Sequence, residues 1–76
     1  MADRAPPPIK LTPRQLECLT RIAAGETSAE IGAALGLSKR TVDHYVTHAV
    51  ARLGVRNRAQ AVAKAIRSRL IPGRAP

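Results

Sequence analysis

The stretch of residues 30–53, EIGAALGLSKRTVDHYVTHAVARL, constrains the fold more than any other part of the chain. It reads as two helices joined by a tight turn. Gly36 lies at the turn, where a positive φ is expected because glycine has no Cβ to clash. Gly32 lies where the two helices touch and only a small residue fits. The side chains expected between the helices are Ile31, Leu35, Leu37, Val42 and Tyr45. The pattern predicts a helix-turn-helix, a motif whose second helix enters the major groove in proteins that bind DNA.

Capping signals place four helices along the chain. The residues expected to cap the helix starts are Thr12, Thr27, Ser38 and Asn57. Gln or Glu follows three residues later at the first, second and fourth starts, which is typical of a capping box. Glycines end the first three helices, and Pro72-Gly73 ends the fourth. No segment alternates like a strand. We therefore expect an all-α four-helix bundle with helices at about 13–24, 28–35, 39–53 and 58–70.

The two ends of the chain differ in composition from its middle. Residues 1–9 hold three consecutive prolines, which favour an extended segment. We expect a flexible linker or tail at 1–9, one domain at 10–71, and a flexible tail at 72–76. A linker implies either a further domain upstream or a chain cut at a domain boundary, and the sequence does not separate these two cases.

Charge and composition narrow the class of partner. The chain has 76 residues, with thirteen Lys and Arg against five Asp and Glu, and after Asp43 every charged residue is basic. A folded basic domain favours a polyanion, and the near absence of aromatic residues argues against a reader of single strands. Duplex DNA fits best. The alternative is a charged face that only keeps a small protein in solution.

The third expected helix has one apolar and one polar face. With Val42 as the reference, Val46, Ala49 and Leu53 point the same way, and the opposite face is polar. The residues on or beside that polar face that could read bases are Arg40, Asp43, His44 and Thr47. Asp43 could accept a hydrogen bond from cytosine or could orient Arg40 or His44. An ordinary solvated face is the alternative for the whole strip.

Two helix starts offer contacts to the DNA backbone. Backbone N–H groups and the helix dipole favour anions there, so we expect phosphate contacts at Lys39 and Thr41, and at Thr27 and Ser28 on the neighbouring backbone. Such contacts would set position and would carry little sequence information.

The fourth expected helix has more apolar surface than a small core can cover. Ala61, Val62 and Ala65 are expected to face inward. The remaining apolar residues at i, i+4, i+7 and i+11 are Ala59, Ala63, Ile66 and Leu70. An exposed apolar stripe of this kind favours a homodimer, and a merely alanine-rich helix is the alternative.

At this point the chain resembles a known family. The run LTPRQLECLTRIAAGETSAEIGAALGLSKRTVDHYVTHAVARLGVRNRAQAV is similar to the LuxR-type (LuxR/NarL/FixJ/GerE) helix-turn-helix domain, over about residues 11–66. The matching residues are Leu11, Thr12, Arg14, Glu17, Leu19, Gly25, Glu30, Ile31, Leu35, Ser38, Thr41, Val42, Leu53, Val55, Arg58, Ala61 and Val62.

This resemblance implies transcription regulation in bacteria. The lone Cys18 rules out an internal disulfide and is compatible with a reducing cytoplasm, and no pattern of catalytic residues is present, so we expect a cytoplasmic protein without enzymatic activity. The resemblance also implies a third helix that reads the major groove, a fourth that forms a homodimer on a dyad site, and usually a regulatory domain before this one. Carried onto this chain, the base-reading positions are Asp43, His44, Thr47 and sometimes Ala51, with phosphate contacts near Lys39, Arg40 and Thr41. The Arg56-Asn57-Arg58 ending resembles quorum-sensing members.

The chain departs from the family pattern at two positions. Asp43 stands where the family often has Lys, which alters the expected reading of DNA. Tyr45 stands where the family usually has His, which can change core packing or a backbone contact.

Other functions fit less well. A sigma-factor-like promoter reader has a similar helical frame, and a helix-turn-helix adaptor would bind protein instead of DNA. A cationic membrane-surface peptide would lack the caps and turns. His44 and His48 have a spacing that can bind metal but lack a third ligand, so we expect no metal and no cofactor. Glu17 could pair with Arg58 or Arg14, and Cys18 is expected to be a small buried residue.

Overall fold

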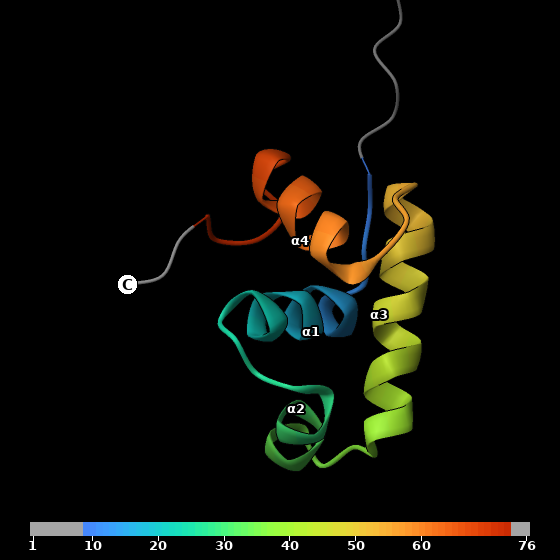
Figure 1. Cartoon of the computed structure of the whole chain (residues 1–76), viewed down its shortest axis with the longest axis vertical. Coiled ribbons are helices and arrows are strands. Elements are labelled where there is room, and N and C mark those ends of the chain that lie inside the picture. The colour runs from blue at the N-terminus through green and yellow to red at the C-terminus, as the bar shows by residue number, and fades with distance from the viewer. Residues whose placement is uncertain (1–8, 74–76) are drawn as a thin grey trace, which may run out of the picture.

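The computed structural model describes residues 9–73, so most of the tails predicted at 1–9 and 72–76 lies outside the described range. Within it the chain forms four α-helices and no strand: α1 (Pro13–Ala23), α2 (Ser28–Leu35), α3 (Lys39–Leu53) and α4 (Arg58–Arg67). The predicted all-α class is confirmed. The longest helix, α3, stands along one side of the molecule, with α2 near its first turns, α1 across its middle and α4 near its last turns (Figure 1).

Each helix begins at the capping residue that the sequence predicts. Thr12 and Thr27 form complete capping boxes with Gln15 and Glu30. Ser38 Oγ accepts the Thr41 N–H at 3.0 Å, and Asn57 Oδ1 accepts the Gln60 N–H at 2.8 Å. These bonds satisfy N–H groups that have no partner inside a helix, so they fix where each helix starts.

The turn between α2 and α3 depends on two glycines. Gly36 has φ 72°, the left-handed conformation expected of it. A Cβ at Gly32 would lie 2.5 Å from the Leu37 carbonyl oxygen. Gly32 therefore allows the turn to fold back against α2, which sets the angle at which α3 leaves.

Two apolar clusters hold the helices together. One joins α1, α2 and α3 and is built on Cys18, Ile31, Val42 and Val46. The other joins α1, α3 and α4 and contains Leu19, Ala49, Leu53, Ala61, Ala65 and Ile71. The inward faces predicted for α2 and α3 are confirmed. Val62 on α4, which is expected to face inward, is half-buried and packs against the second cluster.

The end of α4 differs from the sequence prediction. The helix stops at Arg67, not near residue 70. The Arg69 N–H donates to the Ile66 carbonyl at 3.0 Å, the Leu70 N–H donates to the Ala65 carbonyl at 2.8 Å, and Arg69 has φ 60°. This is a Schellman motif, which ends a helix by reversing the chain. The reversal brings Ile71 into the core, where it is 6% exposed.

The core also reaches into the segment predicted as a linker. Ile9 is half-buried and, with Leu11, packs against the cluster shared by α1, α3 and α4. Arg52 donates from Nε and Nη2 to the Lys10 carbonyl oxygen at 3.3 and 3.2 Å. Ile9 and Lys10 therefore contact the packed helices. Within residues 9–73 no helix has the length and apolar character needed to cross a membrane.

Candidate nucleic-acid interface

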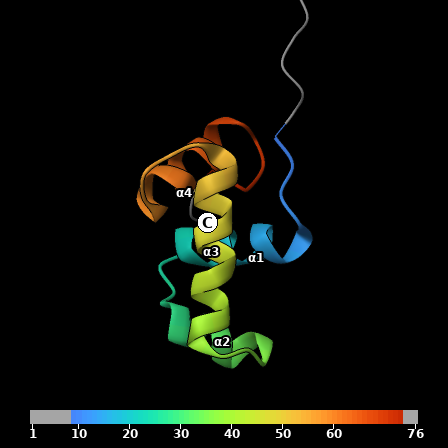
Figure 2. The same cartoon turned by 90° about the vertical axis from the view of Figure 1, so that its right-hand side faces the viewer.

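The outer face of α3 carries an uncovered polar strip. Arg40, His44 and Thr47 are exposed, as is the small residue Ala51 one turn further on. Figure 2 looks onto α3, and the other helices lie behind it. The residues lining an open concavity of about 450 Å³ on this face are Arg40, Thr41, Asp43, His44 and Thr47. The structure thus brings together all four residues predicted to read bases.

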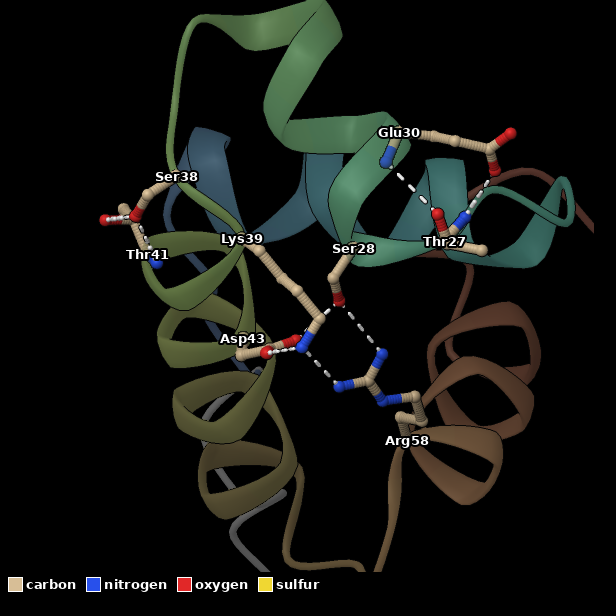
Figure 3. Close-up of polar contacts among 8 residues, drawn as sticks. All are labelled: Thr27, Ser28, Glu30, Ser38, Lys39, Thr41, Asp43 and Arg58. Atoms are coloured by element: carbon tan, nitrogen blue, oxygen red, sulfur yellow. Dashed lines mark hydrogen bonds and ion pairs between the residues drawn. The ribbon is translucent and has the colours of Figure 1, made fainter.

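Asp43 lies at the edge of this strip and is held by residues of three helices. Its Oδ1 accepts hydrogen bonds from Ser28 Oγ on α2 at 2.5 Å and from Arg58 Nη2 on α4 at 3.2 Å. Its Oδ2 accepts from Lys39 Nζ, one turn earlier on α3, at 3.0 Å. Figure 3 shows the carboxylate facing these three donors. Of the two roles that the sequence left open for Asp43, orienting Arg40 or His44 is not seen among the hydrogen bonds of residues 9–73, and the acceptor sites of the carboxylate are largely occupied.

These donors also change the acidity of Asp43. The hydrogen bonds from Ser28, Lys39 and Arg58 lower the pKa of the carboxyl from 3.8 to about 2. The carboxylate is therefore ionised throughout the physiological pH range. It neutralises part of the positive charge carried by the two cations beside it.

The two residues predicted to contact phosphate at the start of α2 differ in accessibility. Ser28 is buried, 5% exposed, and its hydroxyl is engaged by Asp43 and Arg58. The Ser28 hydroxyl is therefore not free to contact a phosphate. Thr27 is exposed at the cap of α2, where its Oγ1 accepts the Glu30 N–H at 3.1 Å and its hydroxyl proton remains available.

The two residues predicted to contact phosphate at the start of α3 remain accessible. The Lys39 side chain is 68% exposed although it pairs with Asp43. Thr41 is half-buried, and its Oγ1 accepts a bond from Ser38 Oγ at 2.9 Å, so its own proton is free to be donated. Both side chains can therefore reach an anion that approaches this helix start.

Arg58 is a site residue that sequence reasoning missed. The sequence suggests Arg58 or Arg14 as the partner of Glu17, and the structure pairs Glu17 with Arg14 at 3.0 Å. Arg58 instead donates from Nη1 to Ser28 at 3.2 Å and from Nη2 to Asp43. The residues lining a second concavity, of about 230 Å³, are Val46, Thr47, Val50, Arg56, Asn57 and Arg58. The signal in the sequence that could have indicated this role of Arg58 is the acidic residue at position 43, because a carboxylate on a basic face favours a cation beside it.

Some of the basic residues that follow Asp43 serve the fold. Lys64 Nζ donates to the Leu53 carbonyl at 2.7 Å, which satisfies the end of α3, and Arg52 binds the Lys10 carbonyl. The arginines that remain exposed after α3 include Arg56 and Arg67. Lys64 and Arg52 thus keep their positive charges, but some of their N–H donors are engaged by the protein itself.

The four residues of the apolar stripe predicted on α4 do not form one exposed surface in the structure. Ala59 and Ala63 are exposed, whereas Ile66 is half-buried against the core. Leu70 lies beyond the end of the helix and also packs against the core, so it does not continue the stripe. Val62, half-buried, takes the adjacent position on the helix. Any contact through α4 would therefore be centred on Ala59, Val62, Ala63 and Ile66.

The remaining groups that the sequence singles out are two histidines and a cysteine. The His44 and His48 rings lie 4.2 Å apart between centroids. Residues 9–73 contain no group of three or more His, Cys, Asp or Glu placed to hold a metal ion. Cys18 is fully buried, as predicted, and burial raises the pKa of its thiol.

Comparison with known proteins identifies the family. The model of the bacterial regulatory proteins of the luxR family, GerE, matches residues 10–65. The chain belongs to the luxR family. Members of this family are transcription regulators, and the matched part is a DNA-binding domain and not an enzyme.

Several luxR-family relatives are similar over most of this chain. The transcriptional activator protein AhyR of Aeromonas hydrophila is 39% identical over 61 residues, which are 80% of this chain and 24% of AhyR. LuxR of Aliivibrio fischeri is 43% identical over 56 residues, which are 74% of this chain and 22% of that protein. LiaR of Bacillus subtilis, a transcriptional regulatory protein, is 39% identical over 69 residues, covering 91% of this chain and 33% of LiaR.

The luxR-family fold is also found among solved structures. The structure of the transcription factor GerE superposes with a TM-score of 0.81 at 25% identity, covering 84% of this chain and 96% of that one. The chain spans about a quarter of the length of the first curated relatives that it matches.

Proposed function

We propose that this chain binds double-stranded DNA in a sequence-specific manner as part of a bacterial transcription regulator, with α3 in the major groove. The observation that carries the proposal is the uncovered strip of Arg40, His44 and Thr47 on a helix held by three others. The major groove is about 12 Å wide and admits an α-helix. Arg40 can donate to guanine or to a phosphate, and His44 and Thr47 can hydrogen-bond to base edges.

Contacts to the DNA backbone would flank this strip. Lys39, Thr41 and Thr27 offer donors at the starts of α3 and α2. They would set the register of α3 in the groove without reading sequence. The family and its named activators and regulators support DNA binding, and the docking geometry is our inference.

We further propose that two copies bind together through α4. Ala59 and Ala63 are exposed small residues that would let two helices approach closely, with Val62 and Ile66 beside them. Two recognition helices on one face of the duplex require half-sites about one helical turn apart. The proposal places the protein in the bacterial cytoplasm, with a regulatory domain before this one, as the greater length of its relatives suggests.

Selection from a library of randomised duplexes tests the reading of DNA. The 76-residue chain should enrich one motif, and its affinity should fall steeply with salt. His44→Ala and Thr47→Ala should relax the preference at individual base pairs more than they weaken binding to unselected duplex. A chain that enriches no motif, or whose affinity ignores salt, would instead fit an adaptor that binds protein.

Footprint length and oligomeric state test the pairing through α4. Ala63→Glu places a charge on the exposed part of the helix and should halve the footprint while leaving the monomer folded. It is a cleaner variant than Ile66→Glu, because Ile66 also packs against the core. Ala23→Glu, at an exposed position on α1, is the matched control. A footprint of two half-sites with Ala63→Glu would exclude this interface.

A further inference from the structure

We propose that Asp43 is a positioning residue for DNA recognition: together with Ser28 and Arg58 it locks the reading helix α3 to α2 and α4 and holds two cations, Lys39 and Arg58, at the edge of the DNA-facing strip. This inference rests on the proposed function. It differs from the sequence expectation, in which Asp43 itself reads a base. A carboxylate is electrostatically unfavourable beside a polyanion. Its proposed role here is to hold the two cations and the helix in place.

The contacts of the cluster connect α2 with α4 across α3. Within residues 9–73, α2 and α4 make no close backbone approach to each other. Arg58, at the first position of α4, bridges this gap by donating from Nη1 to Ser28 and from Nη2 to Asp43. Ser28 Oγ in turn donates to Asp43, so the three side chains form a closed ring of hydrogen bonds (Figure 3). The ring fixes both the start of α4 and the start of α2 against α3.

The cluster leaves its cations accessible. The Lys39 side chain is 68% exposed and the Arg58 side chain is 46% exposed. An ammonium has three donors and a guanidinium has five, so each keeps N–H groups for a further acceptor. The two cations reach Asp43 from different helices, one on each oxygen. A phosphate that approaches this edge would therefore meet two donors already held in place, which lowers the entropic cost of ordering them.

Stability alone does not account for this arrangement. Exposed ion pairs contribute little to folding because solvent screens them and side-chain ordering opposes them. The ring also costs the protein net positive charge on the face that would meet DNA. A geometric role explains why the charge is placed there, since bonds that add little stability can still restrict the orientations of a helix and two long side chains.

Three variants separate positioning from charge. Asp43→Asn removes a negative charge close to DNA, so simple electrostatics predicts tighter binding to every duplex. Arg58→Gln removes the bridge, with Arg56→Gln, two residues earlier and exposed, as a control for the removed positive charge. Ser28→Ala opens the ring without any change in charge. Circular dichroism melting of each variant establishes that it is folded before binding is measured.

The readouts are the ratio of affinities for the selected duplex and for a scrambled duplex, and the salt dependence of each. We expect Asp43→Asn, Arg58→Gln and Ser28→Ala each to lower this affinity ratio by roughly three- to tenfold. The double variant Asp43→Asn/Arg58→Gln should lower the ratio no further than the more damaging of its two single changes, because both changes open the same ring. The log–log salt slope on the selected duplex should also flatten by about one unit for each phosphate that is no longer neutralised. Arg56→Gln should leave the ratio unchanged.

Other outcomes would overturn the inference. Tighter binding of Asp43→Asn to both duplexes alike, with Ser28→Ala unchanged, would reduce Asp43 to a repulsive charge. A changed preference at one base pair, additive with Arg58→Gln, would make Asp43 a base reader. In both cases the wild-type chain still selects a motif, so the proposed function stands. A wild-type chain that selects no motif overturns both proposals.

Discussion

At the scale of single residues, Gly32 and Asp43 most affect how α3 is presented. Gly32 has no side chain because the turn leaves no room for one, and a Cβ there would meet backbone, not a flexible side-chain end. Asp43 has a carboxylate that collects donors from α2, α3 and α4. Gly32 lets the turn fold back against α2. Asp43 connects the first turns of α3 to α2 and α4 through hydrogen bonds.

Gly32→Ala should destabilise the domain by about 1–3 kcal/mol, because overpacking against the Leu37 carbonyl outweighs the gain in helix propensity. Urea denaturation measures the change. Ala33→Gly, at the next and exposed position in α2, is the control and should cost about 0.5–1 kcal/mol through propensity alone. If Gly32→Ala were more stable than wild type, the close approach of the turn would not exist in solution.

Asp43 should give the domain a small sensitivity to acid, because its ion pairs with Lys39 and Arg58 are partly exposed to solvent. The folded state holds the carboxyl pKa at about 2, below the ordinary value of 3.8, so the unfolded chain binds a proton more readily. The stabilisation is present above pH 3.8 and is lost as the pH falls through about 2.

Urea denaturation of wild type and Asp43→Asn across this pH range tests the acid sensitivity. The difference in unfolding free energy should be largest above pH 3.8 and should shrink toward pH 2. A difference that is independent of pH would mean that the contacts of Asp43 do not persist in solution.

At the scale of whole elements, the helix ends follow simple local rules with one exception. The three turns that close α1, α2 and α3 each place a glycine at positive φ. The exception is the end of α4, where Arg69 takes φ 60°. A side chain in the left-handed region costs roughly 1–2 kcal/mol, so this turn stores strain that the burial of Ile71 offsets.

Arg69→Gly should therefore stabilise the domain by about 0.5–1 kcal/mol, since glycine accepts the left-handed conformation and the gain exceeds its greater entropy in the unfolded chain. Thermal unfolding measures the change. Arg67→Gly removes the same charge at the last position of α4 and should destabilise by a similar amount. Equal destabilisation by the two variants would show that residue 69 is not left-handed in solution.

At the scale of the whole molecule, the C-terminal segment completes the core. The family match ends at residue 65, yet the chain beyond it reverses and places Ile71 among residues from α1, α3 and α4. A domain this small has little apolar surface to bury, so each such residue contributes a large share of its stability.

Ile71→Ala should lower the unfolding free energy by about 2–4 kcal/mol, because it removes buried methyl groups and leaves a cavity. Chemical denaturation measures the loss. Pro72→Ala, at the next and exposed position, should change stability by less than about 0.5 kcal/mol. A small effect of Ile71→Ala would mean that residues 66–71 lie outside the cooperative unit.

The sequence by itself determined the four helices, their caps and the inward faces of α2 and α3. These features depend on residues close together in the chain, such as Thr27 with Glu30, three positions apart, or Val42 with Val46, one turn apart. The exposed strip on α3 follows from the same periodicity, so helical spacing alone is enough to select Arg40, His44 and Thr47 as candidates.

Only the tertiary structure decided the contacts of Asp43, the burial of Ser28 and the end of α4. Ser28 and Asp43 are 15 residues apart in the sequence, and so are Asp43 and Arg58. Periodicity within one helix carries no information about such pairs. The end of α4 depends on the packing of Ile71 against core residues that come from other helices. Local propensity alone allowed the helix to continue, and the burial of apolar surface at a distance stopped it.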